Sequence, residues 1–186
     1  GAMNENNELV YVYIYLTPSA ETCIVDKYAW EITDRDEYNH LVVAWVEVKN
    51  LEALGVDSLD YVVLSHRHDD HYGGLVCLNG VFDSIKVGTV FSTGIYNGES
   101  SDPAKLEAKA REHGIECAYL HKGDVVEFGE AHMEVLWPEA DSFGASTSTT
   151  EETNNSSLVL RFEYGDVSAL FAGDLYKSGE ISLIQS

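Results

Sequence analysis

The sequence has little positive charge. It contains 11 lysine and arginine residues against 32 aspartate and glutamate residues, which gives a formal net charge of −21 over 186 residues. Proteins that bind nucleic acid through its phosphates usually present a basic surface, so this composition argues against a preformed basic track. It does not exclude an enzyme that acts on phosphates, because a bound divalent ion supplies local positive charge.

Cysteine and long apolar runs are also scarce. The three cysteines, Cys23, Cys77 and Cys117, are far apart in the sequence and no CxxC pair occurs. This pattern excludes a disulfide framework and a thiolate zinc site, and we interpret the cysteines as buried free thiols. No apolar run reaches the roughly 18 residues that a membrane-spanning helix needs.

The length suits one domain with a substantial hydrophobic core. We interpret residues 1–3, Gly-Ala-Met, as a cloning scar and residues 4–186 as a single domain. Because an N-terminal targeting segment could have been removed with the natural start of the chain, the sequence leaves the compartment unknown.

A dense group of histidines and aspartates is the strongest signal in the chain. Three histidines and two aspartates occur within the six residues from His66 to His71. They follow an apolar run at 61–64 that is typical of a buried strand and precede a run at 75–78 that can continue as a short helix. An exposed turn that binds nothing and a closed structural zinc site are the alternatives to a catalytic metal site. Clustered imidazoles favour a metal, because it offsets the energetic cost of crowding them.

The spacing within this group predicts how the side chains divide. In extended backbone residues i and i+2 point the same way, so His66 and His68 can bind one ion while Arg67 points away. Asp70 and His71 fall where the chain bends, and they could serve a second ion about 3.5–4 Å from the first.

A further candidate ligand lies near the end of the chain. The sequence predicts a hairpin of residues 157–164 and 167–172 around the turn Gly165-Asp166, and the second strand runs into Gly173-Asp174. A carboxylate at the end of a buried strand is costly to bury without a cation. We therefore predict that Asp174 is a metal ligand that bridges two ions.

The rest of the chain alternates between predicted strands and helices. Strands are expected at 9–16, 22–26, 85–91, 115–120, 124–128 and 132–137, and helices at 41–54 and at 104–113 after an Asp102 cap and Pro103. This alternation predicts α/β layering. Residues 139–155 are rich in Ser, Thr, Glu and Ala, so we predict a mobile surface loop there. His113, His121 and His132 are predicted to have structural or surface roles.

The motif His66-Arg67-His68-Asp69-Asp70-His71, followed by Gly73-Gly74, resembles the HxHxDH signature of the metallo-β-lactamase superfamily. The resemblance implies an α/β (α+β) fold, an αββα sandwich with the metal site along one edge of two sheets. Residues 154–161 and 172–175 are similar in particular to the hydrolase domain of the competence protein ComEC and its stand-alone relatives. In that group an Asn-rich segment replaces a third metal-binding histidine, which implies that Asn154 is a weak oxygen ligand or contacts the substrate.

The chain departs from this family pattern at two places. Residues 13–22 lack the Gly-Gln-Gly-Asp turn of the family, and the closing His-His-Gly-Ser segment would follow Ser186. Truncation, disorder of the remaining residues and a degenerate protein are the open alternatives for the closing segment. Without that histidine the second ion has only Asp70, His71 and Asp174. Truncation would leave an apolar edge that could pair with a second copy, so an oligomer is a further expectation.

Together these features predict a metal-dependent hydrolase. One or two zinc ions suit the imidazoles, and manganese is the alternative that suits carboxylate and amide oxygens. The ion would activate water, and Asp70 would orient that water and accept its proton. A phosphodiester as substrate rests on the resemblance alone. An ester, lactone or thioester hydrolase acting on a small molecule, and a metal-binding domain without turnover, are the alternatives.

Overall fold

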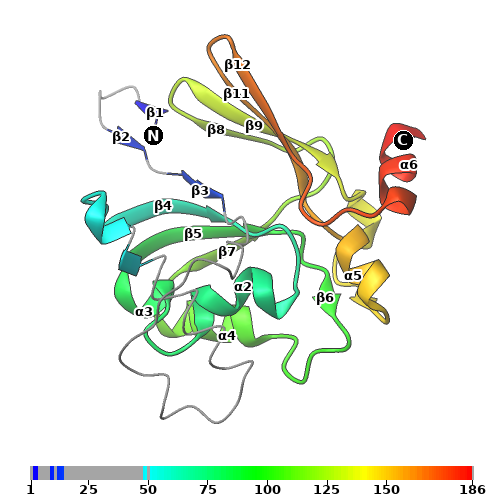
Figure 1. Cartoon of the computed structure of the whole chain (residues 1–186), viewed down its shortest axis with the longest axis horizontal. Coiled ribbons are helices and arrows are strands. Elements are labelled where there is room, and N and C mark those ends of the chain that lie inside the picture. Colours follow the sequence, from blue (N-terminus) through cyan, green and yellow to red (C-terminus); the bar gives the residue numbers. More distant parts are fainter. Residues whose placement is uncertain (1, 4–8, 11, 15–47, 50, 186) are drawn as a thin grey trace.

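A computed structural model describes residues 2–3, 9–10, 12–14, 48–49 and 51–185. A four-stranded parallel sheet forms its centre (Figure 1). In spatial order the strands are β3 (Val12–Ile14), β4 (Ser58–Val63), β5 (Lys86–Ser92) and β7 (Glu116–Tyr119). Since neighbouring strands all run in the same direction, their carboxyl ends lie along one edge of the sheet.

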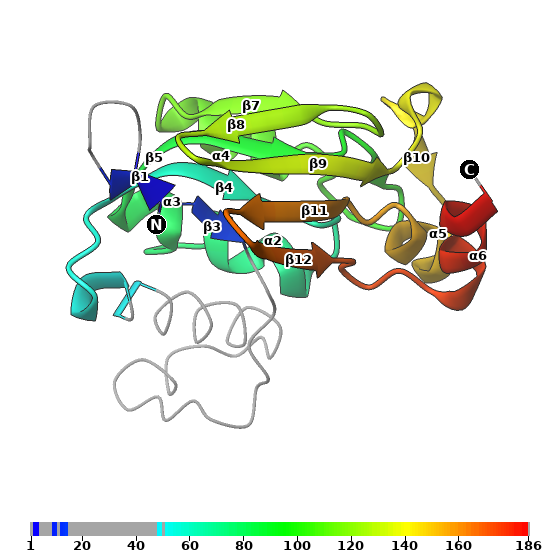
Figure 2. The ribbon, with the colours of Figure 1, turned by 90° about the horizontal axis from the view of Figure 1, so that it is seen from above.

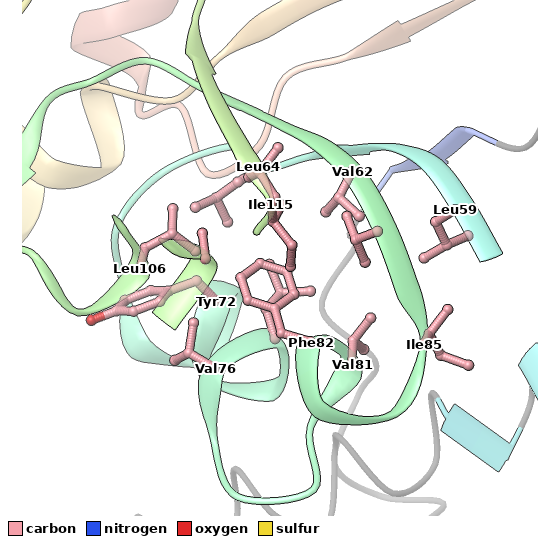
Figure 3. Close-up of a cluster of buried hydrophobic side chains, with 14 of the residues drawn as sticks. Leu59, Val62, Leu64, Tyr72, Val76, Val81, Phe82, Ile85, Leu106 and Ile115 are labelled. Carbon is pink, nitrogen blue, oxygen red and sulfur yellow. The ribbon is translucent and has the colours of Figure 1, made fainter. Parts of the chain in front are cut away.

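Three helices cover one face of this sheet (Figure 1). They are α2 (Asp69–Val76), α3 (Val81–Ser84) and α4 (Lys105–Glu112). Val62 and Leu64 from the β4 segment belong there to one buried cluster with Leu75 of α2 and Leu106 of α4. Figure 3 shows Val62, Leu64 and Leu106 in this cluster. Burial of one such side chain contributes about 1.5–3 kcal/mol, so this cluster fixes α2 and its first turn against the end of β4.

A four-stranded antiparallel sheet packs on the opposite face. Its strands, in spatial order, are β12 (Val167–Phe171), β11 (Val159–Tyr164), β9 (Ala131–Trp137) and β8 (Val125–Phe128). Val63 and Phe91 from the parallel sheet meet Met133, Leu158 and Leu160 in the layer between the sheets. Val63 therefore faces the second sheet while its neighbour Val62 faces the helices, as the two-residue period of a strand requires.

The remaining elements are short. They are α5 (Thr150–Asn155), α6 (Lys177–Gln185), the pair β1 (Ala2–Met3) and β2 (Leu9–Val10), the pair β6 (Tyr96–Asn97) and β10 (Ser146–Thr147), and a 3-10 turn at Ala140–Ser142. Helices α5 and α6 lie together at one end of the second sheet (Figure 2). Asn155 joins them, because its Nδ2 donates to Ser178 Oγ at 3.0 Å. The α/β class is confirmed, and the described residues give the first helix layer and both sheets of the predicted sandwich.

Most of the strands predicted between residues 57 and 172 are confirmed, with ends within one or two residues of the predicted ones. The predicted start of one helix was wrong. Helix α4 begins at Lys105, and its N-cap is Ala104, which makes no side-chain capping bond. Asp102 instead forms a turn, in which its carbonyl oxygen accepts from Lys105 N at 3.2 Å. The helix ends as predicted before Gly114, which has a φ of +69° that glycine adopts without steric cost.

The prediction of a mobile surface loop at 139–155 missed a helix in its second half. Residues 150–155 form α5, whose N-cap Thr149 accepts a hydrogen bond from Glu152 N at 3.2 Å. Thr153 and Asn154 are buried. Composition underestimated this segment because one capping residue and two buried side chains suffice to fix a short helix. The mobility of the segment stays a prediction.

Several predictions fall partly or wholly outside the described residues. These are the strand partner at 22–26, the missing turn at 13–22 and most of the helix at 41–54. Residues 51–53 are helical, and Gly55 has the positive φ of +72° expected at the end of that helix. Across the described ranges, no helix combines the length and apolar character needed to cross a bilayer.

Candidate metal centre

The histidine-rich loop leaves the carboxyl end of β4 and enters α2. Its backbone is still extended at His68, the N-cap of α2, with φ −84° and ψ 145°. His66 Nε2 lies 2.9 Å from His68 Nδ1, whereas Arg67 is buried on the other side against Glu107. The predicted alternation of side chains is confirmed, and the roles of the two histidines as ligands remain predictions.

The next two predicted ligands lie in the first turn of α2. His71 is buried, and its Nε2 is 3.2 Å from Asp174 Oδ2 and 3.9 Å from Asp70 Oδ2. The Asp70 side chain is 69% exposed and that of Asp174 is 48% exposed. The imidazole ring is thus held by the core, while both carboxylates face the solvent side of the site.

Asp174 reaches the histidines through the turn that follows β12. Gly173 in this turn has a φ of +56°. A Cβ atom on Gly173 would lie 2.8 Å from Ser157 Oγ and 3.0 Å from Ser65 Cβ. Glycine is required at this position for two reasons: the positive φ and the close approach of the two chain segments.

Two serine hydroxyls complete the site. Ser65 Oγ lies 3.1 Å from His66 Nδ1 and 3.2 Å from His71 Nδ1. Ser157 Oγ lies 3.3 Å from His66 Nδ1 and accepts from Asp174 N at 3.2 Å. Sequence reasoning missed both serines. Their positions beside the motif and at the start of the last hairpin were the available signal, but serine is too common for position alone to mark it.

Asn154 contributes a buried amide next to His66. The residue is 6% exposed and lies at the end of α5. It is close enough to His66 to raise the pKa of that ring, yet its Oδ1 has no hydrogen-bond partner within the described part of the chain. A buried carbonyl oxygen without a partner is costly, so this oxygen is available to an ion or to a substrate group.

The environment keeps His66 uncharged. Burial, followed by the nearby His71 and His68, lowers the pKa of His66 from 6.5 to about 2, against the smaller opposing effect of Asn154. The ring is therefore neutral at ordinary pH. A neutral imidazole has the free nitrogen lone pair that metal binding requires.

A buried ion pair fastens the loop between the two histidines to α4. Arg67 Nη2 is 2.5 Å from Glu107 Oε1, and Nη1 is 3.2 Å from Glu107 Oε2, so the pair is bidentate. Tyr119 OH also donates to Glu107 Oε1 at 3.1 Å. Burial alone would raise the pKa of Glu107, but the hydrogen bonds and charge of Arg67 hold it below its ordinary value. Asn97 Nδ2 donates to the backbone oxygen of Arg67 at 3.2 Å.

The donor set fits a divalent transition-metal ion. One ligand atom each from His66, His71 and Asp174 lies within 4.8 Å of the other two, and His68 Nδ1 and Asp70 Oδ2 flank this group. Imidazole nitrogen combined with carboxylate oxygen suits zinc, iron or manganese. Metal-binding histidines usually donate their other ring N–H to a hydrogen-bond acceptor, and the Ser65 and Ser157 hydroxyls lie at Nδ1 of these rings.

Three other histidines pair with carboxylates away from this group. His113 is 2.9 Å from Asp83, His121 is 3.2 Å from Asp124, and His132 is 2.9 Å from Glu163. These contacts agree with the structural and surface roles predicted for them.

The sequence pattern that defines the metallo-beta-lactamase superfamily matches residues 36–186. This chain belongs to the metallo-β-lactamase superfamily. The family predicted from the HxHxDH motif is confirmed. Membership of the superfamily implies a metal-dependent hydrolase.

Two competence proteins are similar to the chain. ComE operon protein 3 of Bacillus subtilis (strain 168) is 35% identical over 130 residues, which is 70% of this chain and 15% of that protein. Competence protein ComA of Neisseria gonorrhoeae is 33% identical over 138 residues, which is 74% of this chain and 16% of that protein. The predicted similarity to ComEC-like proteins is confirmed, although the chain spans only a small part of these relatives.

Among solved structures, the chain resembles CmlA, a diiron beta-hydroxylase from Streptomyces venezuelae. The TM-score is 0.38 at 17% sequence identity, over 62% of this chain and 20% of that one.

Proposed function

We propose that this domain binds one or two zinc ions at the candidate metal centre and hydrolyses phosphodiester bonds. The observation that carries the proposal is the convergence of donor atoms from His66, His71 and Asp174 within 4.8 Å of one another. These residues come from two segments that are 103 positions apart in sequence. Such a convergence of imidazoles and carboxylate is the arrangement that metal-dependent hydrolases use.

The donors divide into two groups. His66 and His68 would hold the first ion, with Asn154 Oδ1 as a weak ligand or a contact to the substrate. Asp70, His71 and Asp174 would hold the second ion, and Asp174 would be shared between the two. The imidazole nitrogens favour zinc, and the oxygen donors make manganese the alternative.

The chemistry requires a nucleophile and a base. When bound, the metal ion lowers the pKa of a coordinated water to near 7 and so supplies hydroxide at neutral pH. Asp70 is the proposed residue that orients this water and accepts its proton. Its side chain is 69% exposed, and its Oδ2 lies 3.9 Å from His71 Nε2, so it can reach both the ligand group and solvent.

Similarity to the two competence proteins, at 35% and 33% identity, supports the phosphodiester substrate through the ComEC-like resemblance. Arg67 is paired with Glu107 in the core and therefore does not serve a phosphate. Positive charge for a phosphodiester would thus come from the bound ions.

The acidity of the chain favours a second candidate, an ester, lactone or thioester hydrolase. A net charge of −21 repels a polyanion but not a small neutral substrate. The two candidates share the proposed ligands and differ in the bond that is cleaved, so a pair of reporter substrates separates them.

The test compares bis(p-nitrophenyl) phosphate with p-nitrophenyl acetate and a simple lactone, each with added zinc or manganese. We expect the phosphodiester to turn over and Asp70→Asn to lower that turnover by about 100-fold or more, as loss of a general base does. His132→Ala is the control, because it removes a histidine–carboxylate pair on β9 without touching the proposed ligands.

Turnover of the lactone or acetate alone would replace the phosphodiesterase with the second candidate. No turnover of any reporter by folded, metal-loaded protein would contradict a hydrolase and leave a metal-binding domain. Equal activity in Asp70→Asn and in the control would remove Asp70 from the mechanism.

A further inference from the structure

One hydroxyl group lies between two of the proposed ligands. Ser65 Oγ is 3.1 Å from His66 Nδ1 and 3.2 Å from His71 Nδ1, and the centroids of the two imidazole rings are 4.0 Å apart, with the ring planes inclined at 48°. His66 belongs to the proposed first ion and His71 to the second. Ser65 therefore contacts both halves of the site.

A backbone hydrogen bond fixes the position of the residue that carries this hydroxyl. The carbonyl oxygen of Ser65 accepts from Leu158 N at 2.7 Å, a bond that joins the end of β4 to the start of β11. Ser65 consequently sits where the two sheets meet.

The positions of the protons on the two imidazole rings determine whether the Ser65 hydroxyl donates or accepts when both ions are bound. A neutral imidazole carries one ring proton, so a nitrogen that binds a metal leaves that proton on the other nitrogen. With His66 and His71 binding through Nε2, both Nδ1 atoms carry protons and both must donate. A serine oxygen has two lone pairs and can accept both bonds at once.

We propose that Ser65 is a positioning residue of the metal centre, whose hydroxyl oxygen accepts hydrogen bonds from Nδ1–H of both His66 and His71. It thereby aims both Nε2 lone pairs at the ions. This inference rests on the proposed function, because it needs metal at both histidines. Supporting bonds of this kind typically change metal affinity by about 10- to 100-fold.

The same hydroxyl also suits the metal-free protein. There His71 Nε2 can donate to Asp174 Oδ2 at 3.2 Å, which leaves His71 Nδ1 as an acceptor. The Ser65 hydroxyl then donates to His71 Nδ1 instead of accepting from it. Metal binding is accordingly coupled to a reversal of one hydrogen bond, with Ser65 oxygen in the same place.

Ser157 gives an internal comparison. Its Oγ lies 3.3 Å from His66 Nδ1 and also accepts from Asp174 N at 3.2 Å. Of the two Nδ1–H groups, removal of the Ser157 hydroxyl should therefore affect that of His66, while removal of the Ser65 hydroxyl should affect both. Ser156→Ala is the matched control, since it removes a buried hydroxyl that donates to the Thr153 carbonyl oxygen at 2.7 Å.

The experiment measures zinc affinity by competition with a chelator, together with long-range nitrogen–proton NMR spectra of the zinc-loaded protein that assign the proton on each imidazole. In wild-type protein we expect protected Nδ1–H signals from His66 and His71. In Ser65→Ala we expect about 10- to 100-fold weaker zinc binding and fast exchange of both signals. Ser157→Ala should disturb the His66 signal only, and Ser156→Ala neither.

Two outcomes would overturn the inference separately from the proposed function. The first is wild-type protein that binds zinc but lacks the Nδ1–H signal of one or both rings. Because this result needs only the wild-type protein, it tests the inference even if Ser65→Ala does not fold. The second is folded Ser65→Ala that binds zinc within twofold of wild type with both signals intact. Folded wild-type protein that binds no zinc would overturn the proposed function and this inference with it.

Discussion

Replacement of Gly173 by alanine tests the close contact that brings Asp174 to the histidines. The new Cβ would lie 2.8 Å from Ser157 Oγ, 2.9 Å from Ser157 Cβ and 3.0 Å from Ser65 Cβ. A positive φ of +56° in a residue with a side chain costs about 1–2 kcal/mol. Crowding of this kind adds about 1–3 kcal/mol, so we expect Gly173→Ala to lower the free energy of unfolding by about 2–5 kcal/mol.

Gly165→Ala is the matched control for this variant. Gly165 has a φ of +55°, and no heavy atom lies within 4 Å of its Cβ position. The control therefore contains the backbone penalty of about 1–2 kcal/mol and none of the crowding. The difference between the two variants isolates the contact among Gly173, Ser157 and Ser65.

Urea unfolding of the metal-free variants measures both losses, provided that the slope of free energy against denaturant is unchanged. We expect Gly173→Ala to lose about 1–3 kcal/mol more than Gly165→Ala and to bind zinc more weakly, because Asp174 is displaced. Equal losses in the two variants would show that the close approach at Gly173 does not exist in solution.

Three further predictions concern the elements around the site. Arg67→Met should lower the free energy of unfolding by about 3–5 kcal/mol, because it leaves Glu107 buried without its partner. The double variant with Glu107→Leu should recover part of the loss. If urea unfolding shows that Arg67→Met loses less than about 1 kcal/mol, the buried pair is contradicted. In metal-free protein, burial and the nearby histidines lower the pKa of His66 to about 2, so below pH 6.5 the unfolded chain binds a proton at this residue that the folded chain does not. The free energy of unfolding should therefore fall by about 1.4 kcal/mol per pH unit as the pH drops below 6.5. An unchanged slope in His66→Asn would refute this. Asn154→Ala should weaken zinc or substrate binding while leaving the fold intact by circular dichroism, since its Oδ1 has no partner within the described residues; binding equal to wild type would remove Asn154 from the site.

The sequence predicted those parts of the site that depend on local backbone geometry. Extended backbone places His66 and His68 on one side and Arg67 on the other, because side chains alternate along a strand whatever packs on it. Asp174 lies beside His71 as predicted, but the argument from burying a carboxylate at the end of a strand was wrong, because its side chain is 48% exposed. Both inferences needed only neighbouring residues.

Contacts between distant segments could not be predicted in the same way. The partners of Ser65 and Ser157 depend on how β4 meets β11, as in the bond from Leu158 N to the Ser65 oxygen. No local pattern encodes that meeting. The Arg67–Glu107 pair joins residues 40 positions apart, and neither residue type marks a buried partner because most charged residues are exposed.

Errors in helix boundaries had a different cause. Asp102 and Pro103 are residues that favour both helix starts and turns, and here they form a turn before α4 begins at Lys105. At 139–155 the average composition concealed individual capping and burial by Thr149 and Thr153. Averages over a segment do not resolve such single contacts.

Zinc stoichiometry measured on protein purified without chelators tests whether the histidine motif and the Asp174 segment form one metal centre. The experiment compares the wild-type chain with His68→Ala, Asp174→Ala and the control His132→Ala, which lies outside the ligand group. We predict at least one zinc ion per chain in the wild type and in the control, and its loss in both ligand variants. Folded wild-type protein that takes up neither zinc nor manganese after dialysis, or ligand variants that keep the metal of the wild type, would contradict a metal centre built from these two segments.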